Sequence, residues 1–131
     1  MFVDASALCA ILLNEDDAAA FADKIEAAPL RVTSAVAVFE TVRAVLRQAH
    51  GDAGRARAIV AEFLVEADIG HVEIGTAECE AALDAMDRFG KGRHPARLNM
   101  GDCFAYACAR THDLPLLFKG GDFRETDIAI A

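Results

Sequence analysis

The chain has 131 residues, of which 54% are hydrophobic, and a formal net charge of −8. This length predicts one domain over residues 1–131 with a single core. The negative charge excludes a protein that grips nucleic acid by general electrostatic attraction, because such domains are usually basic. No secretory signal is visible and the longest apolar run, residues 5–13, is too short to span a bilayer, so we expect a cytoplasmic protein without a membrane segment.

The N-terminal segment predicts a short strand that runs directly into a helix. Phe2 and Val3 favour a buried strand, and Ser6 is a natural N-cap for a helix over residues 7–13. Asp4 lies where the strand gives way to the helix. In α/β sheets ligands bind outside the carboxyl ends of the strands, so Asp4 is the first candidate for chemistry.

A second strand and a long helix are predicted next. Residues 30–33 alternate in the manner of a strand, and Ser34 caps a helix over about residues 35–49. Glu40 lies in this helix, just off its apolar stripe. Periodicity alone favours a surface ion pair between Glu40 and Arg43, which lies three residues further on.

Two further helices and a third strand follow. A helix ending near Ala67 would form a helical hairpin with its predecessor, and part of its apolar face can serve a partner chain or the core. Val72 and Ile74 alternate with polar residues as a third strand does. Thr76 caps a helix that stops at Gly90.

A basic loop then interrupts this acidic chain. Its positive side chains are Lys91, Arg93 and Arg97, joined by His94 when that ring is protonated. Arginine and lysine are the residues that contact phosphate groups. The sequence leaves open a phosphate-binding role and a merely solvated loop.

The last part of the chain holds two more acids at element boundaries. Asp102 falls in the first turn of a helix over residues 102–110 that should be buried on nearly all sides, where it can cap the helix or point into a cleft. A final strand over residues 115–118 ends near Asp122, which lies beside glycines and can be a turn residue or a ligand. Asp127 we interpret as a surface residue.

The cysteines give no sign of a metal site or a disulfide framework. None of the four belongs to a C-x-x-C pair or lies near histidines at zinc-ligand spacing. All four are therefore predicted to be reduced core residues, in keeping with a reducing compartment: Cys9, Cys79, Cys103 and Cys108.

Alternating strands and helices predict a parallel sheet with helices on both faces, so that acids far apart in the sequence can meet at one sheet edge. Asp4, Asp102 and Asp122 are placed to do so, and Glu40 can join them if its helix starts at the same edge. Clustered carboxylates repel unless a cation is present, and Mg²⁺ and Mn²⁺ prefer such oxygen ligands. A metal held there can activate water and stabilise the oxygens of a phosphoryl displacement.

Taken together, four motifs in order resemble the PIN-domain ribonucleases, and more narrowly the VapC toxins of bacterial toxin–antitoxin pairs. The resemblance covers the whole chain, and its most specific part runs from Gly92 to Cys103. The motifs are Asp4-Ala5-Ser6, Glu40, Gly101-Asp102-Cys103 and Lys119-Gly120-Gly121-Asp122-Phe123.

The resemblance implies a PIN-like three-layer α/β/α sandwich with a short, mainly parallel sheet. It implies a Mg²⁺- or Mn²⁺-dependent endoribonuclease that hydrolyses RNA phosphodiester bonds, is neutralised by a VapB-type antitoxin and forms homodimers and toxin–antitoxin hetero-oligomers. It also implies that an arginine of the antitoxin enters the acidic site.

Carried over residue by residue, the resemblance makes Asp4, Glu40, Asp102 and Asp122 the acidic quartet, with Asp4 and Asp102 as direct ligands and Glu40 as a ligand or a base. Ser6 would support the first turn. Many family members place the fourth acid closer to the strand, where this chain has Gly120, so Asp122 is expected to reach the metal through water.

Two other functions stay open at this point. A phosphatase or phosphotransferase with Asp4 as its nucleophile would also place an acid after the first strand, although haloacid-dehalogenase-like enzymes usually carry a second acid where this chain has Ser6. A non-catalytic protein whose sheet-edge acids attract a basic peptide is the other alternative.

Overall fold

Four short parallel strands form the central sheet of the computed structural model, which describes residues 1–131. The strands are β1 (Phe2–Val3), β2 (Val32–Ser34), β3 (Gly70–Val72) and β4 (Leu116–Leu117). Their order in the sheet is β3-β2-β1-β4, so the first two strands of the chain are central. Phe2 pairs with Val32 on one side and with Leu116 on the other, which aligns the carboxyl ends of β1, β2 and β4.

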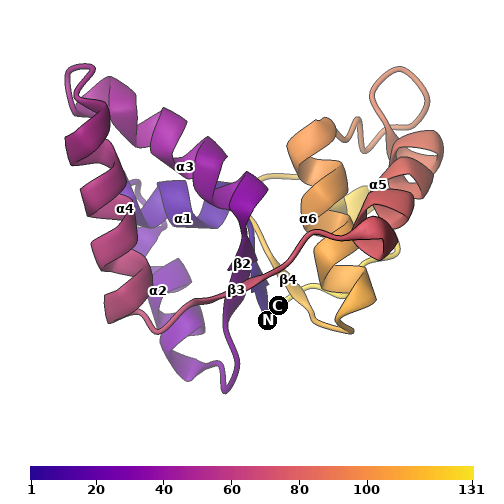
Figure 1. Ribbon diagram of the computed structural model, residues 1–131. Helices are drawn as coiled ribbons and strands as arrows, with labels where there is room; N and C mark the ends of the chain where they lie inside the picture. The colour runs from indigo at the N-terminus through magenta and orange to yellow at the C-terminus, as the bar shows by residue number, and fades with distance from the viewer.

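Helices cover both faces of this sheet (Figure 1). They are α1 (Ala5–Leu12), α2 (Ala18–Ala27), α3 (Ala35–Gln48), α4 (Ala53–Glu66), α5 (Thr76–Phe89) and α6 (Met100–Thr111), and a short 3₁₀ helix, η1 (Asp122–Glu125), follows β4. Helices α1 to α4 lie on one side, and α5 and α6 lie on the other. The predicted α/β/α sandwich with a parallel sheet is thereby confirmed.

The core consists of two apolar clusters separated by the sheet. Phe2 and Leu116 belong to the cluster beneath α5 and α6, whereas Val3 and Leu117 belong to the cluster beneath α1, α3 and α4. Successive strand residues point to opposite faces, so even two-residue strands contribute to both clusters. The sheet is thus buried on both sides, and only its ends are free for chemistry.

Several predicted element boundaries are wrong. Asp4, not Ser6, caps α1, because its carboxylate accepts a hydrogen bond from the Ser6 backbone N–H. Gly75, not Thr76, caps α5. Strand β3 ends at Val72, before Ile74.

One single-residue interpretation also fails. Cys79 is exposed, so it is not a core residue, although all four cysteines are free. Asp127 is exposed, as predicted, and it also accepts hydrogen bonds from Tyr106 (2.6 Å) and Arg88 (2.8 Å), which tie the C-terminal segment to α5 and α6. None of the six helices combines the length and the apolar character needed to cross a membrane.

Candidate metal centre

Asp4 lies at the carboxyl end of the central strand β1 and is buried. Its Oδ2 accepts hydrogen bonds from the Ser6 hydroxyl (2.5 Å) and the Ser6 backbone N–H (2.9 Å). Burial raises the pKa of Asp4, and the two Ser6 hydrogen bonds oppose that rise. The carboxylate is therefore held in one orientation in a setting that disfavours its charge.

Ser6 connects this turn to the segment after β4. Its hydroxyl oxygen accepts a hydrogen bond from the backbone N–H of Lys119 (2.9 Å) while its own hydrogen goes to Asp4. The ends of the neighbouring strands β1 and β4 are thus joined through one serine side chain.

Asp102 lies in the first turn of α6 and is partly buried. Its Oδ2 accepts a hydrogen bond from the Asn99 backbone N–H (2.8 Å), and the Asn99 side chain accepts one from the Asp102 N–H (3.2 Å). This reciprocal capping fixes Asp102 at the positive end of the helix. Asp102 therefore does cap α6, as one of the two interpretations held, and it also faces the other acids.

Glu40 comes from the second turn of α3, whose N-terminus follows β2 directly. It forms no ion pair with Arg43, contrary to the expectation from periodicity. Burial and the charge of Asp4 raise the pKa of Glu40, and Arg43 acts in the opposite direction. Gly101 lies against its carboxylate so closely that a Cβ at that position would overlap both oxygens.

Asp122 is the most loosely held of the four acids. It begins η1, its residue is exposed, and its side chain makes no hydrogen bond. Its position depends on the loop after β4, where Gly120 adopts a φ of +108° that favours glycine.

The charges of the three other acids all act on Asp102. Burial raises the pKa of Asp102 to about 6, the hydrogen bond from Asn99 opposes the rise, and the charges of Asp4, Asp122 and Glu40 add to it. A sheet edge, two helix starts and a loop thus deliver like charges to one place. The four carboxylates are the hard oxygen donors that Mg²⁺ and Mn²⁺ prefer.

The carboxylates do not form a finished coordination shell. No three His, Cys, Asp or Glu side chains lie close enough in the structure to hold one ion together. The donor set nevertheless fits a divalent cation, because three of the four groups have raised pKa values and bringing them closer costs repulsion that a cation would relieve. The carboxylates of Glu40 and Asp122 accept no hydrogen bond that fixes them, and both would have to turn toward the ion.

The basic loop precedes α6 and lies at the upper end of the molecule in Figure 1, the end at which α6 begins. It surrounds an open hollow of about 450 Å³ lined by Lys91, Gly92, Arg93, His94, Pro95 and Arg97. Arg93 is paired with Asp87 (2.5 Å), whereas Lys91 and Arg97 form no ion pair. Two of the three positive side chains of the loop, Lys91 and Arg97, therefore have no acidic partner within the protein.

The sequence analysis assigned no role to three residues at this centre. The capping role of Asn99 could have been predicted, because an N-cap residue three positions before an acid is a capping-box pattern. Gly101 was noted only as part of a motif, and nothing in the sequence indicates its contact with Glu40. The side-chain contacts of Lys119 with Glu15 and Asp17 join positions 104 and 102 residues apart, which no local pattern reveals.

Comparison with known proteins places this arrangement in a family. The family model described as "PIN domain" matches residues 1–129. The chain is 40% identical over 129 residues to Ribonuclease VapC30 of Mycobacterium tuberculosis, covering 98% of this chain and 96% of the relative. It is equally 40% identical over 129 residues to Ribonuclease VapC of Mycolicibacterium smegmatis, with 98% of each protein covered.

Among solved structures, VapC20 of Mycobacterium tuberculosis, a toxin that cleaves the sarcin–ricin loop, superposes with a TM-score of 0.78 over 99% of this chain and 97% of that one. The two sequences are 17% identical, so this likeness concerns the fold. On the family model and the near full-length relatives, the chain belongs to the PIN-domain family and, within it, to the VapC ribonucleases of toxin–antitoxin systems.

Proposed function

We propose that this VapC ribonuclease is a Mg²⁺- or Mn²⁺-dependent endoribonuclease whose metal is held by Asp4, Glu40, Asp102 and Asp122. The observation that carries the proposal is the fixed orientation of Asp4 at the end of β1 and of Asp102 in the first turn of α6, and the raised pKa of Asp102, to which the three other acids contribute, agrees with it. Such a cluster is costly for the protein alone and is compensated when a doubly charged ion enters. Metal dependence is also typical of VapC ribonucleases.

Each side chain then has a role that its surroundings support. Asp4 and Asp102 would be direct ligands, because Ser6 and Asn99 hold them in fixed orientations. Glu40, backed by Gly101, would be a ligand or would accept a proton from the attacking water. The metal, when bound, supplies charge neutralisation for the phosphodiester and lowers the pKa of water.

The basic loop would hold the RNA backbone. An enzyme with a net charge of −8 needs local positive groups to approach a polyanion, and Lys91 and Arg97 are free of ion pairs. Arg93 and His94 line the same hollow and would add contacts. We propose that cleavage takes place in the cytoplasm, where the RNA substrate is found.

The test of the acidic site is substitution of single ligands. Asp4→Asn or Asp102→Asn should abolish divalent-dependent RNA cleavage and leave the circular dichroism spectrum unchanged, because the asparagine oxygen can still accept the capping hydrogen bond. Asp84→Asn, at an exposed position of α5, is the matched control and should cleave as the wild type does. Full cleavage by either site variant at low Mg²⁺ would refute the proposal.

Membership of the VapC family implies a VapB antitoxin as partner. We place its binding surface on the helical hairpin of α3 and α4. There a hollow of about 520 Å³ is lined by Val38, Ala61, Leu64, Val65, Asp68, Ile69, Gly70 and His71, and Val65 is 80% exposed. An amphipathic helix of the antitoxin would bury this apolar surface.

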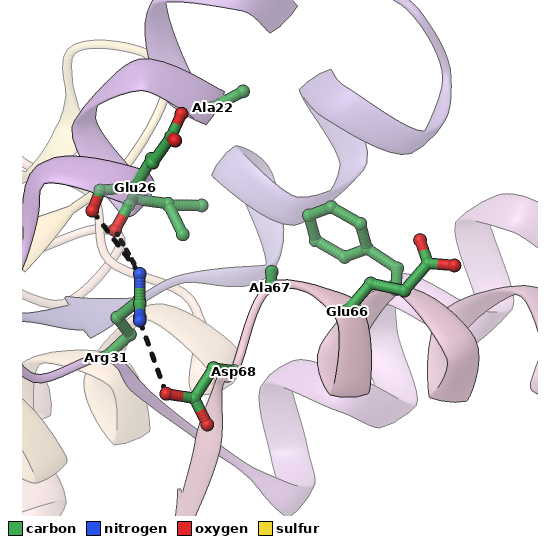
Figure 2. Close-up of a pocket in the computed structure, with 8 residues that line it drawn as sticks. Ala22, Glu26, Arg31, Glu66, Ala67 and Asp68 are labelled. Atoms are coloured by element: carbon green, nitrogen blue, oxygen red, sulfur yellow. Dashed lines mark hydrogen bonds and ion pairs between the residues drawn. The ribbon is translucent and has the colours of Figure 1, made fainter.

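A second hollow, of about 280 Å³, adjoins this surface between α2 and α4 (Figure 2). Arg31 lies within it and donates hydrogen bonds to the backbone oxygens of Ile25 and Glu26 and to the Asp68 carboxylate. The acids Glu26, Glu66 and Asp68 border an apolar floor, which suits a partner with basic side chains.

The antitoxin surface can be tested with one exposed residue. Val65→Glu should weaken inhibition by the cognate antitoxin about tenfold, because it places a charge in an apolar contact, while RNA cleavage is unchanged. Ile130→Glu, at an exposed apolar residue near the C-terminus, is the control and should leave inhibition unchanged. Unaltered inhibition of Val65→Glu in a titration of cleavage against antitoxin would exclude this surface.

We also propose that the protein forms homodimers and joins its antitoxin in hetero-oligomers. Exposed large apolar side chains on α3, α5 and α6 support self-association, since water contact with them is unfavourable. They are Phe39, Leu83, Met86 and Met100.

A further inference from the structure

The loop after β4 has an anchor that the proposed function does not use. Lys119 Nζ bridges Glu15 Oε2 (2.5 Å) and Asp17 Oδ1 (2.7 Å), which lie in the turn between α1 and α2. The backbone N–H of the same residue donates to Ser6 Oγ (2.9 Å), whose hydrogen goes to Asp4. One residue thus binds an acidic turn with its side chain and a ligand-orienting serine with its backbone.

This anchor acts on a segment that has few other restraints. The segment is bounded by Phe118 and Phe123, both buried, whose rings pack 4.9 Å apart. Between them Gly120 and Gly121 are exposed, and a Cβ at either position would meet nothing. Lys119 is therefore the only residue of the loop's exposed part that is fixed by side-chain contacts.

The orientation of Asp4 and the position of Asp122 depend on where this loop lies. Asp4 is oriented by Ser6, and Ser6 is oriented by the Lys119 N–H. The side chain of Asp122, three residues after Lys119, makes no hydrogen bond. The position of Lys119 consequently sets how Asp4 and Asp122 stand relative to each other.

We propose that Lys119 is a positioning residue of the metal centre, which fixes the loop that carries Asp122 relative to the Asp4 carboxylate through its contacts with Glu15, Asp17 and Ser6. This inference rests on the proposed metal-dependent function and adds a residue to it. Lys119 touches neither the metal nor the RNA in this role.

The charge of Lys119 and its positioning role predict opposite effects of Lys119→Met on the affinity for a divalent cation. Lys119→Met removes a positive charge near an anionic site, so electrostatics alone would make a divalent cation bind more tightly. Loss of the anchor would instead let the loop move and make the cation bind less tightly. The direction of the change therefore separates the two effects.

The experiment is calorimetric titration of Mn²⁺ into the RNA-free protein, together with thermal unfolding of each variant. We expect Lys119→Met to weaken Mn²⁺ binding by about fivefold to tenfold, toward the lower end of what residues behind metal ligands contribute. Lys119→Arg, which can still bridge both carboxylates, should restore most of the affinity. Lys24→Met, which removes an exposed lysine bonded to the Ala131 oxygen, is the control and should bind Mn²⁺ as the wild type does.

A second variant secures the test. In a protein that carries Glu15→Ala and Asp17→Ala the anchor is already broken, because both acceptors of Lys119 are gone. Adding Lys119→Met to that protein should therefore change Mn²⁺ affinity far less than it does in the wild type. Equal or tighter Mn²⁺ binding by Lys119→Met overturns the positioning role, as does an equal effect in both backgrounds. A wild-type protein that binds no Mn²⁺ would instead refute the proposed metal site itself.

Discussion

At the scale of a single residue, the Asp102 carboxylate is subject to two opposing influences on its pKa. Its carboxylate caps α6 through the Asn99 N–H, which favours the ionised form, while burial and the charges of Asp4, Asp122 and Glu40 favour the protonated form. The second influence prevails and raises the pKa of Asp102 to about 6. The metal-free protein thus holds an acid that is partly protonated near neutrality.

This raised pKa predicts a pH dependence of stability. Between the ordinary pKa near 4 and the folded pKa of about 6 the folded protein binds more protons than the unfolded chain, so the stability of the metal-free protein falls as pH rises through that window. The loss should be about 1–2 kcal/mol, because partial solvent exposure reduces it. Urea unfolding of wild type and Asp102→Asn between pH 4 and 7 measures it.

Asp102→Asn cannot ionise and should lose less stability over the same window, so that it is the more stable protein at pH 7. Saturating Mg²⁺ should reduce this difference by favouring the ionised wild type. Parallel stability curves for the two proteins would contradict the environment described for Asp102.

Some of these residue roles were predictable from the sequence and others were not. Asp4 and Asp102 follow from general rules, since one ends a buried strand and the other opens a buried helix. Glu40 was a conditional candidate from the sheet topology and became one of the four acids by family resemblance, because helical periodicity alone favoured a surface pair with Arg43. The contact between Gly101 and Glu40 depends on how α3 and α6 pack, which no local pattern encodes.

At the scale of elements, the strands are short and the helices position the chemistry. Strands of two or three residues suffice because both faces are covered by apolar helices. Helix positions were predictable from apolar periodicity and caps, as with Ser34, whose side chain accepts from the Ala37 N–H. The prediction placed β3 too late in the chain, around Val72 and Ile74, because its first two residues, Gly70 and His71, are exposed and carry no alternating apolar pattern.

The loop between α5 and α6 gives a prediction at this scale. Replacing Arg93 and Arg97 by alanine should weaken RNA binding and make its dependence on salt shallower, by about 1.4 in the slope of log K against log salt if both contact phosphates of a single strand. Fluorescence anisotropy with a labelled RNA and the Asp102→Asn protein, which should not cleave, measures the slope.

Replacing Arg55 and Arg57, two exposed arginines of α4, removes the same charge from a different surface and provides the control. If the loop variant and the α4 variant have equal slopes, the loop does not contact the RNA backbone.

At the scale of the whole molecule, the sheet order brings distant acids together. Because β1 lies between β2 and β4, the residues that follow these three strands meet at one edge, and α6 adds its first turn there. The architecture and the convergence of Asp4, Asp102 and Asp122 could be predicted from alternating strands and helices. The anchor through Lys119 could not, because it depends on the tertiary position of the turn between α1 and α2.

The same topology explains how an acidic protein can act on a polyanion. Four of its acids lie where a divalent cation would offset part of their charge, and its densest cluster of positive side chains lies in the loop that leads into α6. The antitoxin surface that we propose, on α3 and α4, is separate from this loop.

A crystal structure of the wild-type protein grown with Mn²⁺, with data collected at the manganese absorption edge, tests the central claim most directly. The account predicts an anomalous peak bound by carboxylate oxygens of both Asp4 and Asp102, with Glu40 and Asp122 turned toward it. A fully occupied Mn²⁺ elsewhere on the protein, with no ion between Asp4 and Asp102, would contradict it.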